Sequence, residues 1–286
     1  MFIIVGWILV MGCVIGGYLA HHGKIGVLIV PTEYLIIGGA SLGALIASSS
    51  MAEIKRIIKY CTHAFSAKEP NKQEFMDLLM LLFELTKTGR ANLLGLEEHV
   101  ENPESSAIFS KYPTVLKNHH AIDFICDTMK VQISSPLSPY DLEELMDADI
   151  NAMHGEELFV PTAINRMADA FPAIGIVAAV LGVILTMGKL TQGKEVIGNS
   201  VASALVGTFL GILLSYGIAG PLANRIAGII DEEGKTIAVI KVCLLAFAKD
   251  ASPKICVEFA RRTIPPELRP DFTEVDEATA NVGKAA

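Results

Sequence analysis

The sequence has long stretches without a single charged residue, and these absences limit what the protein can be. Four such runs occur, over residues 2–20, 34–52, 170–188 and 196–224. Each is close to the roughly 20 apolar residues that cross a bilayer as a helix. With 51% hydrophobic residues and a mean hydropathy of +0.46, the chain is too apolar for an ordinary soluble protein. The pattern predicts four spanning helices.

Cysteine pairs and catalytic motifs are also lacking. The five cysteines stand far apart without a C-x-x-C pair, so neither a disulfide framework nor a zinc site is expected. No phosphate-binding loop, G-x-S-x-G or H-E-x-x-H is present. His119 and His120 near Asp123 come closest to a catalytic cluster, and nothing else converges on them. We therefore expect no enzyme activity, no catalytic residue, no bound metal and no cofactor.

The charges of the chain are concentrated in two segments, which we expect to face water. Its net charge of −8 argues against a nucleic-acid partner. Basic residues next to the spans favour a cytoplasmic location for both segments by the positive-inside rule. The prediction is an all-α integral membrane protein, divided into residues 1–52 (spans one and two), 53–169 (a large helical cytoplasmic domain), 170–223 (spans three and four) and 224–286 (a cytoplasmic C-terminal helix and tail).

The water-facing segments show helical periodicity, and no strand-like alternation persists in them. One helix face is predicted from the spacing of Phe75, Leu78, Leu79, Leu82 and Leu85. Helix starts are indicated by Asn71 with Glu74, and by Ser138 with Asp141. From about Pro265 the chain is polar, and we expect this tail to be poorly ordered.

Glu33 directly precedes the second predicted span, which begins at Tyr34. Its place at the edge of the span predicts an interfacial carboxylate in the headgroup region; the alternative is a residue at a pore mouth that attracts cations. The four charge-free runs contain no acid of their own. A charge in mid-bilayer costs about 2.5–3.5 kcal/mol on insertion scales and is kept only for function. If the chain conducts ions, the titratable group is therefore expected from a partner helix.

The fourth predicted span carries small residues at a spacing of four, which places them on one helix face. Small residues let helices pack closely within membranes. We therefore expect a docking face for the partner helix along Ser203, Gly207, Gly211 and Ser215.

Two prolines and two threonines mark the third and fourth spans. Pro172 and Pro221 are expected on the same, cytoplasmic side, where each either forms a hinge or marks a helix boundary. Thr186 and Thr208 are expected to bond to the carbonyl four residues earlier. Thr208 lies beside the small-residue face, so its alternative is to face a wet pathway.

Several stretches resemble the MotA family of bacterial flagellar stator subunits, and the likeness covers nearly the whole chain in order. The resemblance implies an inner-membrane protein with four spans in the lipid bilayer. It implies five copies around two copies of a MotB-type one-span partner that supplies an essential Asp. Proton flow past that Asp would turn the ring and drive the rotor protein FliG. The matching stretches are Gly16-Gly-Tyr-Leu, Phe75-Met-Asp-Leu-Leu, Glu101-Asn-Pro, Ala170-Phe-Pro-Ala-Ile-Gly, Val206-Gly-Thr-Phe-Leu-Gly and Val257-Glu-Phe-Ala-Arg-Arg.

The resemblance also implies roles for residues of the ion pathway. Pro172 and Pro221 match prolines that couple ion flow to cytoplasmic movement, and Thr208 matches a threonine near the ion site. Ala179 stands where sodium-driven relatives have threonine. Because a methyl group cannot coordinate sodium whereas oxygen can, we predict protons as the coupling ion.

The rotor contacts are implied in the same way. Glu97 matches the acidic contact of the family, and Arg90 is expected as the basic one. The main arginine of the family would align with Gly89, one place away.

The alternative functions are a proton-driven energiser of outer-membrane processes, of the ExbB or TolQ type, and a membrane scaffold without ion flux.

Overall fold

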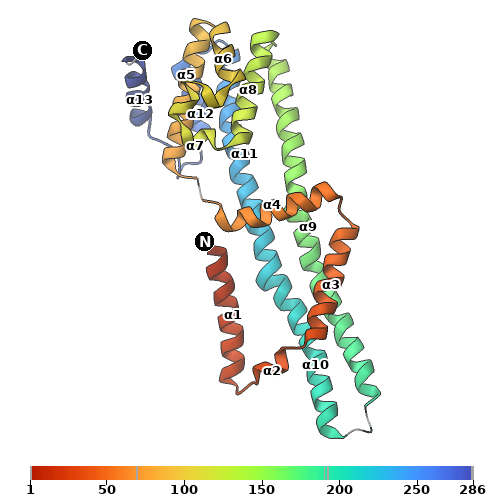
Figure 1. Cartoon of the computed structure of the whole chain (residues 1–286). Helices are drawn as coiled ribbons and strands as arrows, with labels where there is room; N and C mark the ends of the chain where they lie inside the picture. The colour runs from red at the N-terminus through yellow and green to blue at the C-terminus, as the bar shows by residue number, and fades with distance from the viewer. Residues whose placement is uncertain (1, 69, 190, 192, 285–286) are drawn as a thin grey trace. The chain divides into compact units, whose positions relative to one another are not determined.

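The computed structural model describes residues 2–68, 70–189, 191 and 193–284, and all regular structure in them is helical (Figure 1). The chain forms two compact units, the first comprising Met1–Ala67 and Glu156–Ile230, the second Lys68–Gly155 and Asp231–Ala286. The predicted all-α membrane fold is confirmed, because four segments of the described residues are long and apolar enough to span a membrane. The division by membrane side remains a prediction.

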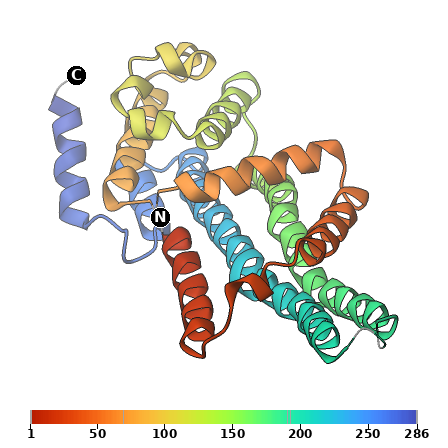
Figure 2. The ribbon, with the colours of Figure 1, turned by 60° about the horizontal axis from the view of Figure 1, so that its bottom comes forward.

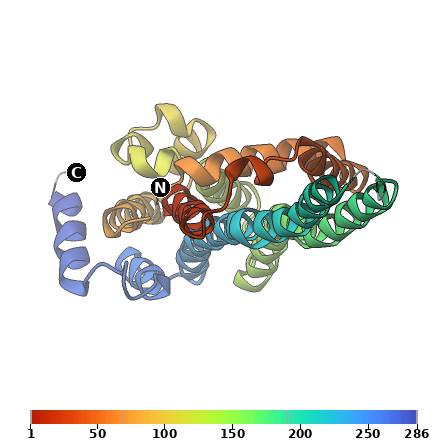
Figure 3. The ribbon, with the colours of Figure 1, turned by 90° about the horizontal axis from the view of Figure 1, so that it is seen from below.

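The helices of the first unit begin with α1 (Phe2–Ala20), α2 (Ile25–Leu28), α3 (Pro31–Ala47) and α4 (Met51–Ser66). Two long helices, α9 (Pro139–Met187) and α11 (Gly220–Ala248), belong to both units. Between them come α10 (Lys194–Ile212) and the π-helix η4 (Leu213–Ala219). Viewed from below, α3 lies beside the hairpin of α9 and α10 (Figure 3).

The second span differs from its predicted limits of 34–52. It comprises α2 and α3, from Ile25 to Ala47. Pro31 begins α3 because its fixed φ and missing N–H suit the first helical position. The chain leaves the helix at Ser48, and Ser50 caps the next helix by accepting from the backbone N–H of Glu53. Ser48, Ser49 and Ser50 therefore separate α3 from α4, whereas the predicted span continued to Ala52.

Helix α4 crosses α9 and α11 within the first unit (Figures 1 and 2). Its buried face consists of Ile57, Tyr60 and Ala64, which pack in one cluster with Ile164 of α9 and Ile226 of α11. Lys55, Ile58 and Lys59 are exposed on the other side of the helix. The apolar face of α4 is therefore used for packing within the chain.

The second unit has its own core, built around α5 (Lys72–Ala91). The five apolar residues of the predicted α5 face are all buried, which confirms that helix. The predicted helix starts are also confirmed: Asn71 accepts from the N–H of Glu74 at 3.0 Å, and Ser138 from that of Asp141 at 3.2 Å. The other elements confined to this unit are η1 (Leu94–Leu96), α6 (Glu97–Glu101), η2 (Pro103–Ser105), η3 (Phe109–Lys111), α7 (Pro113–Leu116), α8 (His119–Ser134), α12 (Pro253–Thr263) and α13 (Phe272–Lys284).

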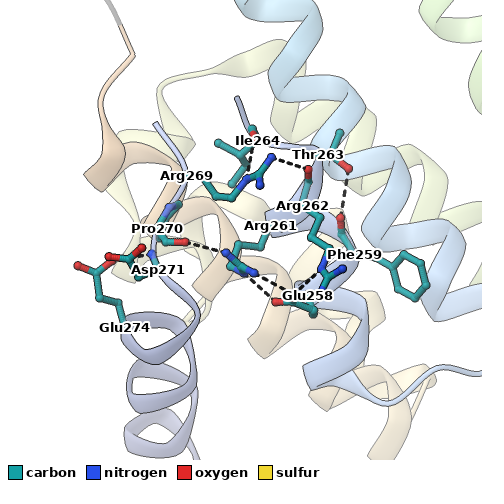
Figure 4. Close-up of polar contacts among 10 residues, drawn as sticks. All are labelled: Glu258, Phe259, Arg261, Arg262, Thr263, Ile264, Arg269, Pro270, Asp271 and Glu274. Carbon is teal, nitrogen blue, oxygen red and sulfur yellow. Dashed lines mark hydrogen bonds and ion pairs between the residues drawn. The ribbon is translucent and has the colours of Figure 1, made fainter. Parts of the chain in front are cut away.

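The C-terminal segment is ordered, and the expectation of a poorly ordered tail from Pro265 is wrong. An ion-pair network holds the link between α12 and α13 (Figure 4). Glu258 accepts from Arg261 at 2.7 and 2.9 Å and from Arg262 at 2.7 Å. Arg261 also donates to the carbonyl of Pro270 at 3.1 Å. The polar residues here take part in half-buried ion pairs and hydrogen bonds to the backbone.

The Glu258 network predicts a loss of stability in acid. The hydrogen bonds from Arg261 and Arg262 lower the pKa of Glu258 from 4.5 to about 2. Because the folded-state pKa is depressed, this contribution is complete above about pH 4.5 and disappears as the pH falls toward 2. It amounts to about 2–3 kcal/mol. Unfolding curves of the detergent-solubilised chain and its Glu258→Gln variant should therefore converge between pH 4.5 and 2.5.

A matched control is Glu97→Gln, because Glu97 is exposed and outside this network. Its stability difference from the parent chain should stay small across the same pH range. A gap between the parent chain and Glu258→Gln that does not change with pH would contradict the prediction.

Candidate functional site

The hairpin of α9 and α10 is held together by glycines whose backbones meet. A Cβ added at Gly211 would lie 2.5 Å from the carbonyl oxygen of Phe171 and 3.2 Å from Cα of Gly175. One added at Gly175 would lie 2.7 Å from the carbonyl oxygen of Gly207. Such close approach requires glycine at positions 175 and 211, because a side chain there would collide with the backbone of the facing helix. The glycine seam, which we define as Gly175, Gly182, Gly207 and Gly211, therefore fixes the spacing of the two helices.

The seam corrects the prediction of a docking face for a partner helix. Gly207 and Gly211 are covered by α9 of the same chain, and Ser215 is only 2% exposed. These residues are unavailable to another protein. The surfaces that remain exposed are instead the large apolar side chains Ile176, Val180 and Ile184 of α9, with Leu205, Ile212 and Tyr216 in α10 and η4.

Pro172 lies inside α9, which continues through it, so it is not a helix boundary. Its missing N–H leaves the helix one hydrogen bond short. The neighbouring residue Phe171 is the one whose carbonyl approaches Gly211. The proline is thus adjacent to the tightest contact of the glycine seam.

Pro221 is the second residue of α11, two residues after the end of the π-helix η4 at Ala219. The N–H of Gly220 bonds to the carbonyl of Ser215, five residues earlier, as in a π-helix. A wider turn makes room for a proline ring that would otherwise crowd the carbonyl four residues before it. Pro221 is exposed and lines a groove of about 310 Å³ together with Trp7 of α1 and Arg225.

The two span threonines differ in their hydrogen bonds. Thr186 donates to the carbonyl of Gly182 at 2.7 Å, as predicted. Among the residues that the structure describes, the half-buried hydroxyl of Thr208 has no partner, which leaves it free for the alternative role on a wet pathway. Ala179 is close by, because its backbone nitrogen lies 3.3 Å from the Cβ position of Gly207. Ala179 therefore contacts Gly207, the residue that precedes Thr208 in α10.

Glu33 also packs against Gly207, a contact that sequence reasoning missed. Glu33 is only 5% exposed, so neighbouring helices cover it, and its predicted place in the headgroup region stays a prediction. A Cβ at Gly207 would lie 2.6 Å from Glu33 Oε2. That oxygen is buried without a hydrogen-bond partner in the part of the chain described. The expectation that no spanning segment contains an acid is corrected as well, because Glu33 lies inside the span Ile25–Ala47.

Arg90 is held within the second unit. It donates to the carbonyl oxygens of Ala251 at 2.9 Å and Phe247 at 3.3 Å, and pairs with Asp250 at 2.6 Å. Its guanidinium also lies 5.2 Å from the ring centroid of Phe247. Gly89 is buried, and a Cβ there would lie 2.7 Å from Leu96 Cδ1, so no arginine fits at that position.

Glu97, at the start of α6, is exposed, and its side chain has no partner among the described residues. Its charge is therefore available to another protein, whereas that of Arg90 is largely engaged. Whether either residue contacts a rotor remains a prediction. No group of three or more His, Cys, Asp or Glu side chains in the described residues is arranged to hold a metal ion.

Comparisons with known proteins agree over the whole chain. Residues 4–92 match the motility protein A N-terminal family, and residues 117–238 match the MotA/TolQ/ExbB proton channel family. Motility protein A of Escherichia coli (strain K12) is 37% identical over 97% of this chain and 94% of its own. Chemotaxis protein LafT of Vibrio parahaemolyticus is 32% identical over 95% and 96%.

Solved structures share the fold. The chain in the C. jejuni MotAB structure superposes with a TM-score of 0.77 at 18% identity, covering 93% of this chain and 96% of that one. The flagellar MotAB stator complex from Bacillus subtilis gives 0.72 at 20% identity, covering 89% and 92%. The chain belongs to the motility protein A family of flagellar stator subunits.

Proposed function

We propose that this chain generates torque in the flagellar motor by coupling proton flow across the bacterial inner membrane to movement of its cytoplasmic part. The observation that carries the proposal is the 37% identity to a motility protein A over 97% of the chain. The charge-free hairpin, with Pro172 at the glycine seam and Pro221 after a π-helix, supports it. In this proposal residues 53–169 and 224–286 face the cytoplasm.

The proposal includes a MotB-type partner with one span, which supplies the intramembrane Asp. The similar solved structures are MotAB complexes, which supports such a partner. Five copies of this chain would surround two copies of the partner. The exposed apolar side chains of α9, α10 and η4 provide surfaces for neighbouring copies, the partner and lipid.

In the same proposal the second unit drives the rotor protein FliG through charged contacts. Glu97 is the better supported contact, because it is exposed and without a partner among the described residues. Contacts between exposed charges guide association and weaken with salt. The alternative, an energiser of the ExbB or TolQ type, is disfavoured by the match of residues 4–92 to the motility protein A N-terminal family.

The coupling ion is tested by swimming speed in a strain whose only stator contains this chain and its partner. We expect speed to follow the proton-motive force and to stay constant when external sodium is varied at fixed proton-motive force. The physical reason is that the methyl group of Ala179 offers no oxygen to sodium.

The matched control carries an Asp-to-Asn change in the span of the partner, which should abolish swimming. Swimming by this control would contradict the role of the partner. Sodium dependence at fixed proton-motive force would contradict proton coupling. Complete failure of the unaltered pair to restore swimming in a stator-deficient strain would contradict the torque function.

A further inference from the structure

Glu33 occupies a helix position at which a carboxylate ordinarily has a local role. It is the third residue of α3, after Pro31 and Thr32, where a glutamate can bond back to the N-cap N–H. Glu53 at the same position of α4 does this, with its Oε2 2.6 Å from the backbone nitrogen of Ser50. Glu33 makes no such bond; its side chain extends to Gly207 of α10 instead. Helix capping therefore does not explain this carboxyl group.

Gly207 makes the space that the Glu33 carboxyl occupies. A methyl group at Gly207 would collide with Glu33 Oε2 at 2.6 Å and would lie 3.2 Å from Ala178 Cβ. Helices α3, α9 and α10 thus meet at one point. Ser41, two turns further along α3, is 1% exposed, and its hydroxyl is also without a partner among the described residues. The buried face of α3 is polar at both ends, with Ile37 between them.

In the part of the chain that the structure describes, no charged side chain faces Glu33 from the elements packed around it. Gly207 is thirteen residues beyond Lys194, about 20 Å along the helix axis. The charged residues nearest to this point along the hairpin are Asp169 and Lys189 in α9 or just after it, and Glu195 and Arg225 in α10 and α11. Helix α2 has no titratable residue, and the hydroxyl of Tyr34 donates to the carbonyl of Leu28.

A carboxyl group in such surroundings is stable only when it is neutral or compensated. Burying an ionised carboxylate without a partner costs far more than burying the neutral acid, so the group takes up a proton instead. Ionisable groups kept inside a membrane protein mark ion pathways and proton relays.

We propose that Glu33, inserted between α3, α9 and α10 at Gly207, is a proton-binding site of this chain itself, which passes protons in series with the acid of the partner. This inference rests on the proposed function. The bound species is a proton on the carboxyl oxygen: the carboxylate gains a proton on uptake and loses it on release, and no other reactant is involved. Proton transfer then uses two carboxyl groups, one from each protein.

The first test measures proton flux through the chain assembled with its partner in liposomes that contain a pH-sensitive dye. Glu33→Gln keeps the size of the side chain but cannot release a proton, and we expect its flux to fall at least tenfold. Glu33→Asp keeps an acid and should lie between Glu33→Gln and the parent. Glu53→Gln is the matched control and should conduct like the parent. Full flux in Glu33→Gln would overturn the proposal.

The second test is independent of flux and keeps the two proposals distinguishable. Infrared difference spectra between the parent chain and Glu33→Gln, each alone in lipid, should show the carbonyl stretch of a protonated acid at neutral pH. A carboxylate band instead, or a band that shifts with sodium at fixed pH, would overturn the proton site. If the acid band is present but the parent complex conducts no protons, the proposed function fails while the assignment of Glu33 stands. If Glu33→Gln does not accumulate, Glu33→Asp is measured in its place. A proton flux and an acid band that respond to pH as in the parent support the site. A spectrum without an acid band refutes it.

Discussion

Replacing Gly211 by alanine is expected to abolish swimming and to lower the stability of the chain. The added Cβ would lie 2.5 Å from the carbonyl oxygen of Phe171 and 3.2 Å from Cα of Gly175. Both obstacles are backbone atoms, so no side-chain rotation can relieve the collision, and α9 and α10 must separate. Overpacking of this kind typically costs about 1–3 kcal/mol, and contact with backbone places it at the upper end. Thermal unfolding in detergent and a swimming assay measure the two effects.

A matched control for this change exists in the same helix. A Cβ at Gly198 would meet nothing within 4 Å. Since alanine favours helix over glycine by up to about 1 kcal/mol, Gly198→Ala should be neutral or slightly stabilising. If Gly211→Ala unfolds at the same temperature as the parent, a loss of swimming in this variant is not caused by separation of α9 from α10.

Replacing Arg90 by alanine is expected to destabilise the second unit by about 2–3 kcal/mol, before any effect on a rotor. Asp250 has a φ of 64°, and the N–H of Ala251 bonds to the carbonyl of Ala246, which closes α11 with a Schellman motif. Arg90 completes this end by donating to the carbonyls of Phe247 and Ala251. Because Asp250 is 89% exposed, the ion pair itself contributes little.

Two further variants separate packing from charge. Arg90→Lys keeps the charge but loses the planar group that reaches two carbonyls, so it should lose most of the stabilisation that Arg90 contributes. Glu97→Gln should leave thermal unfolding unchanged while weakening torque in a salt-dependent way. A fully stable Arg90→Ala chain that nevertheless fails to swim would show that Arg90 acts on the rotor and would contradict the capping role.

Much of the fold follows from local patterns in the sequence. The charge-free runs predict the spans because a membrane tolerates few charges, and the spacing of Leu78, Leu79 and Leu82 predicts α5 because one helix face must be buried. Helix starts at Asn71 and Ser138 depend only on neighbouring residues. These features need no knowledge of which helices meet.

The features that were missed depend on contacts between distant residues. Glu33 lies at a helix start that is usually solvated, and its burial comes from Gly207, far along the chain. The spacing of four at Gly207 and Gly211 was read correctly as a packing face. However, periodicity alone does not tell whether the neighbour is α9 or another protein. The tail from Pro265 was misjudged because Arg269 and Glu274 look like solvated charges, although Arg269 donates to the carbonyl of Ile264 and Glu274 pairs with Lys72.

The π-helix η4 sets how the start of α11 is rotated about the helix axis relative to α10. A π turn accommodates about one residue more than an α turn, so everything after Gly220 is offset by roughly 100° relative to an uninterrupted α-helix. Ile226 and Ile230 pack with α4 in that offset orientation. If these seven residues formed an ordinary α-helix, Ile226 and Ile230 would face away from α4. The π-helical turns of this uncharged segment therefore link the orientation of the glycine seam to that of α4.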